Sequence, residues 1–297
     1  MTVRLNPDLI PNLLISIEQS KMNEATATQQ LASGRNVNQP SDDPAASAAL
    51  VRNHDQADQD AQFLQNMTSL QAKFQVADST LSNTYQAMNR ALTLAVEGAN
   101  GTLSASDRQA LASEVQGLLN ETVSLANATY QGAYLFAGTT VSSPPFTLDP
   151  STNTVTYNGD SQTTTVQLTN GNSITGNVPG DQLFLNGNGS IFGSLQDLYT
   201  ALNTGNNLSA AVTEVSNAVS KLDSQRVFYG NALNQITLSD SFLNQDKLNL
   251  SQQENGLVGA DMAEVASNFS QAEVANQATL SATSLILNQK TLLDYMA

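Results

Sequence analysis

The chain has 297 residues and a net charge of −15, with no Cys, no Trp and 5% aromatic residues. This charge excludes nucleic acid and anionic lipid as partners, because a polyanion repels both, and the missing Cys excludes disulfides and thiolate metal sites. The length suffices for two domains, but so few aromatic residues favour long thin helices over one large globular core.

The N-terminal segment predicts a helix. Its apolar residues follow helical spacing: Leu9, Ile10, Leu13, Leu14, Ile17, Ala25 and Leu31. Pro7 and Pro11 interrupt the apolar start, so we expect no cleavable signal peptide there. No apolar run along the chain is long enough to insert across a membrane.

A turn follows this first helix. Gly34 is a typical helix-ending residue. Asp42 and Asp43 stand before Pro44, which predicts a turn, an N-cap and a Pro at the first helical position. A metal or acid–base pair of the two carboxylates is the alternative, but adjacent residues at a helix start do not converge on one ligand. Capping therefore explains them better.

Residues 44–97 contain no Gly and no Pro after Pro44, and their apolar residues recur at helical spacing. They predict a helix of roughly 80 Å at 1.5 Å per residue. A loop with Asn100 and Gly101 ends it, and the two helices around this loop form an antiparallel hairpin.

The second helix of this hairpin has signals at both ends. Ser104 and Asp107 predict a capping box at its start. Its apolar residues continue to about Gly132, where we expect the helix to stop. The chain then changes character, because residues 139–190 are rich in Thr, Asn, Gly and Ser.

The middle of the chain predicts a small β-rich insert. Alternating residues indicate strands at 154–157, 163–168 and 182–185, separated by Asn-Gly and Pro-Gly turn signals. A short helix around 195–202 follows. Between 212 and 250, apolar residues alternate three and four apart over five heptads, which predicts a coiled-coil seam.

The C-terminal stretch, 261–297, predicts a final helix after a break at Asn255, Gly256 and Gly259. Asp261 is its expected N-cap and Glu264 the reciprocal residue. The apolar stripe reaches the last residues, whereas chain ends are usually polar and frayed. We therefore expect the two terminal helices to pair and to be covered by other copies of the chain. Burial against the rest of the chain as a closed bundle is the alternative.

Nine residues are the candidate assembly and partner-binding contacts of these terminal helices. They are Leu13, Ile17, Leu31, Val265, Phe269, Leu285, Leu292, Tyr295 and Met296. Each large apolar side chain removed from water contributes ~1.5–3 kcal/mol, so the terminal stripes could stabilise an assembly strongly.

The predicted fold is mainly α: a long-helix coiled-coil rod with paired terminal helices and a small β-rich insert at the far end. The terminal assembly domain comprises 1–40 and 257–297, and the helical rod 41–138 and 191–256. Residues 139–190 form the insert.

Nothing in the sequence supports an enzyme. His54 is the single histidine, and one His with no Cys makes a zinc site or a catalytic triad improbable. We expect no cofactor, no metal and no catalytic residue.

Several motifs resemble the flagellin superfamily. Residues 31–45, LASGRNVNQPSDDPA, are similar to its "SG…N.PSDDPA" turn, and Asn100-Gly101-Thr102 to its "NGT" loop. Residues 134–146 contain YLFAGT and PPF, and 291–296 read TLLDYM. These resemble the hook-associated members at the hook–filament junction, although that ending has Ser and Phe where this chain has Thr291 and Leu293. The resemblance assigns the structural turn motif to Gly34, Asp42, Asp43, Pro44, Asn100 and Gly101.

This resemblance implies a structural, flagellin-like subunit that joins hook to filament and serves motility. It implies secretion by the flagellar type III export apparatus without signal cleavage, an extracellular location in the flagellum, and a cytoplasmic chaperone on the C-terminal helix. It also implies a ring of copies between the first hook-associated protein and flagellin. Three alternatives stay open: a minor flagellin of the filament, a secreted adhesin acting through the insert, and a coiled-coil signalling module.

Overall fold

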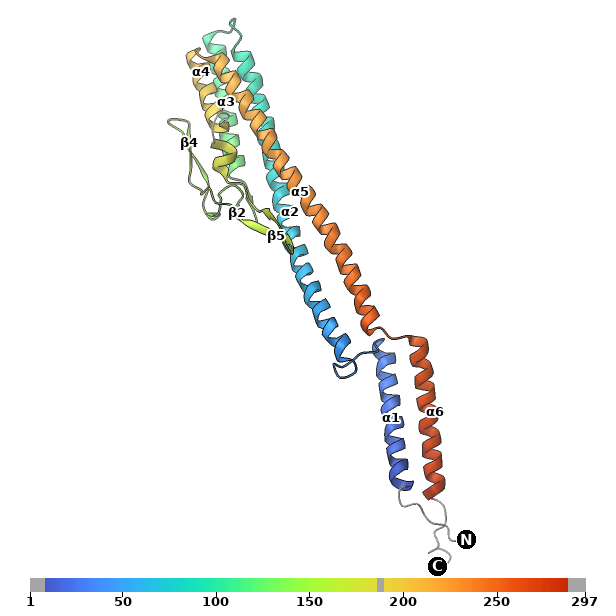
Figure 1. The fold of residues 1–297 in the computed structure, drawn as a ribbon. Coiled ribbons are helices and arrows are strands. Elements are labelled where there is room, and N and C mark those ends of the chain that lie inside the picture. The colour runs from blue at the N-terminus through green and yellow to red at the C-terminus, as the bar shows by residue number, and fades with distance from the viewer. Residues whose placement is uncertain (1–8, 186–189, 288–297) are drawn as a thin grey trace, which may run out of the picture. The chain divides into compact units, whose positions relative to one another are not determined.

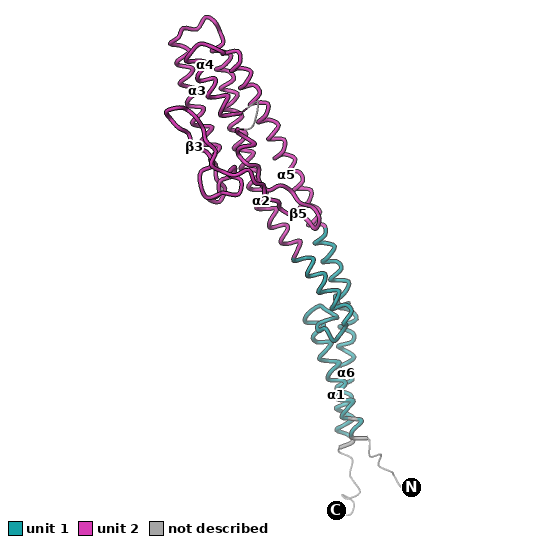
Figure 2. Tube along the Cα trace, turned by 60° about the vertical axis from the view of Figure 1, so that its left-hand side comes forward, with its two compact units in different colours: residues 1–58, 246–297 teal, residues 59–245 magenta. Residues whose placement is uncertain are grey.

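The computed structural model of the chain describes residues 9–185 and 190–287 (Figure 1). It divides into two compact units, residues 1–58 with 246–297 (unit 1) and residues 59–245 (unit 2), coloured separately in Figure 2. The three-part division at 40, 138, 190 and 256 stays a prediction.

Six helices make up most of the described chain. They are α1 (Leu9–Ser33), α2 (Pro44–Gly98), α3 (Ala105–Ala126), α4 (Ile191–Thr204), α5 (Leu208–Val258) and α6 (Met262–Leu287). The mainly α prediction is confirmed. The expected start signals act as predicted, because the Asp43 carboxylate accepts the N–H groups of Ala45 and Ala46 at 2.9 Å, and Ser104 with Asp107 forms a complete capping box.

Two predicted helix ends are wrong. α3 ends at Ala126, because Gly132 (φ 81°) and Gln131 (φ 51°) instead form the turn between β1 (Thr129–Tyr130) and β2 (Ala133–Tyr134). Two successive residues with positive φ are typical of tight hairpin turns. At the other end, α5 continues through Asn255 and Gly256 to Val258.

The insert contains two antiparallel hairpins. β3 (Phe146–Asp149) pairs with β4 (Thr154–Tyr157), and β5 (Thr165–Thr169) pairs with β6 (Asn172–Thr175). The strand predicted at 182–185 is wrong, because Asp181–Leu185 form one π-helical turn, η1. Its neighbours Leu183 and Phe184 are both buried, whereas successive residues of a strand point to opposite faces.

An aromatic cluster holds the insert against α4. The ring centroid of Phe146 lies 5.3 Å from that of Phe184 and 5.2 Å from that of Phe192. The rings of Phe184 and Phe192 stack with 5.5 Å between their centroids. Phe136 contacts Phe184 edge to face at 5.4 Å. Such aromatic pairs add to the free energy of burial, so this cluster forms the centre of the insert's core.

A heptad has two apolar positions in every seven residues, and the prediction for α5 is right for one of them. Residues at every seventh place are buried: Val215, Leu222, Tyr229, Ile236 and Leu243. The other buried set lies one residue earlier than predicted, at Ala211, Ala218, Ala232 and Ser239. Tyr229 packs edge to face on Phe74 of α2, with 5.4 Å between ring centroids. One row of the seam therefore holds mostly large residues, and the row beside it holds small ones.

Truncating Phe74 to Ala should destabilise unit 2 strongly. Its ring is 1% exposed, and such truncations cost about 3–5 kcal/mol through lost burial and a residual cavity. Urea denaturation followed by circular dichroism measures the change. Phe242→Ala is the matched control, since Phe242 of α5 is 62% exposed and should alter the free energy of unfolding by less than about 0.5 kcal/mol. Equal losses in both variants would contradict this packing.

Candidate assembly site

The terminal helices α1 and α6 pair within the single chain (Figure 1). Their seam consists of small and polar side chains. Ala27 of α1 and Ala272 of α6 line this seam together and are buried, as is Val265 of α6, and the Asn276 amide donates to the Glu24 carboxylate at 2.6 Å. A groove of about 470 Å³ runs along this seam, lined by small and polar residues of both helices. The pair is therefore held by a narrow contact.

Many large apolar side chains of both helices are exposed to solvent. Seven of them are about half or more exposed: Leu14, Ile15, Met22, Met262, Val274, Leu280 and Leu285. At about 100° per residue, Val274 and Leu285 lie on roughly the opposite side of α6 from Ala272. They are 62% and 69% exposed. Large apolar side chains exposed on paired helices are candidates for contacts with another subunit.

The structure distributes the nine predicted contact residues over different environments. Val265 is buried in the seam, and Ile17, Leu31 and Phe269 are half-buried. Leu285 faces solvent. Leu292, Tyr295 and Met296 lie outside the described residues, as does the side chain of Leu13. The expected single stripe is thus two surfaces, one toward the seam and one outward. Their role in assembly stays a prediction.

The two breaks beside these helices bond to each other. Asn36 N–H donates to Val258 O at 2.7 Å, and Ala260 N–H donates to Gly34 O at 3.0 Å. Gly34 has φ 68°, and nothing lies within 4 Å of the place a Cβ would take. The left-handed backbone therefore explains this glycine. The segments expected to separate the terminal helices from the rest are joined by a short two-stranded contact.

Side chains reinforce this joint. The Arg35 guanidinium donates to the Glu254 carboxylate at 2.8 Å, and His54 Nε2 lies 3.5 Å from the same carboxylate oxygen. Val37, Ala46 and Val258 form a small apolar core beside them. The paired side chains lie 200 or more positions apart in the sequence, so no local pattern indicated these contacts. The joint thus links the segment that follows α1 to the segment that precedes α6.

The predicted turn residues organise the loops. The Asp42 carboxylate accepts the N–H groups of Asn38 and Gln39 at 3.0 and 2.9 Å. Asp42 thus folds the turn while Asp43 caps α2, whose first residue is Pro44. These separate roles match the capping interpretation. In the loop before α3, the Asn100 side chain accepts the Thr102 hydroxyl at 3.0 Å, and Gly101 is exposed beside it.

The chain matches known families at both of its ends. Residues 9–140 match the bacterial flagellin N-terminal helical region, and residues 212–296 match the bacterial flagellin C-terminal helical region. The chain belongs to the bacterial flagellin family. In this flagellin-family chain, residues 141–211, which contain β3 to β6 and α4, lie outside both matches.

Individual relatives narrow the comparison. The chain is 32% identical to flagellar hook-associated protein 3 of Salmonella typhimurium over 276 residues, which cover 84% of this chain and 86% of that protein. A putative flagellar hook-associated protein from Vibrio parahaemolyticus has a similar fold, with a TM-score of 0.66 at 20% identity, covering 73% of this chain and 100% of that one. The flagellar junction protein of Legionella pneumophila also has a similar fold, with a TM-score of 0.61 at 18% sequence identity. The match covers 71% of this chain and 100% of that one.

The predicted apolar stripes include fewer than half of the outward apolar residues of this flagellin-family chain. Leu14 was counted in the N-terminal stripe, but Ile15, Met22, Val274 and Leu280 were not. Their size could have indicated them, because they are large apolar residues of helices whose seam is filled by Ala27 and its neighbours.

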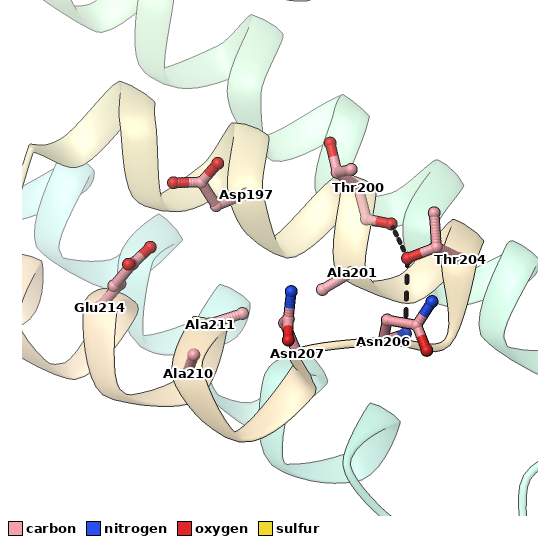
Figure 3. Close-up of a pocket in the computed structure, with 9 residues that line it drawn as sticks. All are labelled: Asp197, Thr200, Ala201, Thr204, Asn206, Asn207, Ala210, Ala211 and Glu214. Carbon is pink, nitrogen blue, oxygen red and sulfur yellow. Dashed lines mark hydrogen bonds between the residues drawn. The ribbon is translucent and has the colours of Figure 1, made fainter.

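Two carboxylates form a second polar cluster, between α4 and α5. Asp197 and Glu214 line a groove of about 300 Å³ together with threonine and asparagine side chains (Figure 3). Desolvation raises the pKa of Glu214 above its ordinary value, and a hydrogen bond and the charge of Asp197 act in the same direction. In the described part of the chain, no group of three potential metal ligands gathers and no helix has the length and hydropathy of a membrane span.

This pair predicts a pH dependence of stability. Because the folded pKa of Glu214 exceeds its unfolded value, the folded state binds more protons, and the free energy of unfolding should rise as pH falls through the folded pKa. Glu214→Gln should stabilise the chain at neutral pH, by up to about 1 kcal/mol as for exposed charge pairs, and flatten the acid-side slope. Thermal unfolding between pH 4 and 8 measures both effects.

The matched control is Asp223→Asn, which removes an exposed carboxylate from the same helix and the same unit of charge. Asp223→Asn should show the same dependence of the free energy of unfolding on pH as the native chain. A slope unchanged in Glu214→Gln, or lost equally in both variants, would contradict the pairing of Glu214 with Asp197.

Proposed function

We propose that the chain is a structural, non-enzymatic subunit of the hook–filament junction of the bacterial flagellum. The observation that carries this proposal is the outward apolar surface of α1 and α6, in a chain related to hook-associated protein 3 over 84% of its length. A surface of this kind costs free energy in water unless another subunit covers it.

The mechanism follows from the narrow seam. Ala27 and Ala272 are small residues buried in the seam, so the large exposed side chains of α1 and α6 remain available to neighbours. Covering one fully exposed Leu or Val contributes ~1.5–3 kcal/mol. The seven large residues of the outward surface are 46–69% exposed, so each contributes part of this free energy when a neighbour covers it, and together they offset part of the entropy lost on association. The contacts are head to tail, from one copy to the next.

The same surface explains the proposed partners. Copies of the chain form a ring, with the first hook-associated protein on one side and flagellin on the other. Before export, a cytoplasmic chaperone covers the C-terminal helix, which otherwise exposes Val274, Leu280 and Leu285. Export through the type III apparatus, without a cleaved signal, brings the chain to the extracellular flagellum.

Deleting the gene and complementing it with variants tests this role. In the deletion strain we expect hooks without filaments and flagellin released into the medium, and the wild-type gene should restore filaments. Leu285→Asp should fail to restore them, because it places a charge on the outward surface. Its thermal melting should stay within about 0.5 kcal/mol of the native chain, since Leu285 contacts little in the monomer.

Gln277→Asp is the matched control, because Gln277 is an exposed polar residue of the same helix and should restore filaments. Electron microscopy and immunoblots of the medium give the readouts. Filaments that persist in the deletion strain would contradict a junction role and favour a minor flagellin. Full restoration by Leu285→Asp would contradict assembly through the outward surface.

A further inference from the structure

A second groove lies in unit 2, outside the terminal helices. It has a volume of about 690 Å³ and is bounded on one side by α2, from Gln62 to Lys73, and on the other by the β5 segment, residues 164–167. Phe63 and Leu70 supply apolar surface, and Asn66 and Ser69 supply polar groups. The groove is therefore lined on one side by a strand and is chemically mixed.

The strand β5 presents an open edge. Its sheet has two strands, so β6 occupies one side of β5 alone. Gly176 N–H donates to Thr164 O at 2.7 Å. Hydrogen-bonded pairs alternate along an antiparallel ladder, so the next bonded pair is Val166 with Ile174. The backbone N–H and C=O groups of Thr165 and Gln167 consequently point away from β6.

Lys73 supplies a positive charge at this groove. Its ammonium donates one hydrogen bond, to Gly176 O at 2.9 Å, which leaves two further donors. Burial lowers the pKa of Lys73. Among the described residues, Lys73 takes part in none of the ion pairs. A half-buried ammonium without a carboxylate favours an anionic group from outside, since burying an unpaired charge is costly.

We propose that this groove binds an extended acidic peptide segment of a partner protein, which adds as a third strand to the free edge of β5 and places a carboxylate on Lys73. Addition of a strand to an exposed sheet edge is a recurrent mode of peptide recognition, in which backbone bonds give affinity and side-chain contacts give specificity. This site is separate from the outward surface of α1 and α6 and goes beyond the proposed junction role.

The geometry favours a peptide over other anions. Thr165 and Gln167 offer backbone donors and acceptors two residues apart, the spacing at which a neighbouring strand presents its own. The half-buried side chain of Phe63 can receive an apolar residue of that strand, beside Leu70, which is buried. A small anion would use Lys73 alone and leave the edge of β5 and this apolar surface unused.

Selection from a displayed library of random eight-residue peptides, on the immobilised full chain, tests the proposal. Peptides enriched on the native chain but depleted on Lys73→Gln should share one Asp or Glu among alternating β-branched or aromatic residues. In calorimetric titration, the best selected peptide should bind Lys73→Gln at least about tenfold more weakly. Lys73→Arg should recover part of the affinity, and Lys247→Gln, which removes an exposed lysine of α5, should bind as the native chain does.

A second experiment tests backbone pairing between the peptide and β5. Thr165→Pro removes an N–H on the free edge of β5 and leaves the bonded pairs of β5 with β6 in place, so it should abolish binding. Ser173→Pro makes the same change on the far edge of the hairpin, because Ser173 opposes Gln167, and should bind normally. Far-UV circular dichroism checks that each variant folds.

Three outcomes would overturn the proposal. One is a selection that enriches no peptide on the native chain over Lys73→Gln. Another is a selected peptide without a carboxylate. The third is equal binding to folded Thr165→Pro and Ser173→Pro.

Discussion

The narrow contact between α1 and α6 is the constraint on which the proposed function depends. Ala27, Val265 and Ala272 fill it, and the Asn276–Glu24 hydrogen bond closes it. Larger side chains in the seam would bury apolar surface within one chain. Because small and polar residues fill much of the seam, seven large apolar residues of α1 and α6 stay about half or more exposed in the single chain. In the proposed function, covering these residues on assembly adds stability that the single chain lacks.

Local signals predicted the helices well. The run from Pro44 to Gly98 is uninterrupted by other breakers, and Asp43 and Ser104 cap the helices they precede. Heptad spacing located the large residues of the α5 seam, from Val215 to Leu243. These features depend on interactions between residues close in sequence or on one helix face, so periodicity and capping chemistry suffice to find them.

Long-range packing accounts for what the sequence did not reveal. The aromatic cluster around Phe184 turns residues 181–185 into a π-helical turn, although their alternation suggested a strand. Arg35 finds Glu254 across 219 positions, and this joins segments whose glycines had suggested loose connections. Which face of α6 meets α1 could not be predicted either, since Val265 and Leu285 belong to the same apolar pattern yet lie on different sides.

Labelling of single cysteines tests the outward surface most directly, because the chain has no Cys of its own. Leu280→Cys on the outward surface and Ala272→Cys in the seam would each be reacted with a maleimide, in the isolated chain and in purified flagella. We expect Cys at 280 to react rapidly in the isolated chain and to be protected in flagella, while Cys at 272 reacts slowly in both. Equal reactivity of Cys at 280 in the two states would contradict the claim that assembly covers this surface.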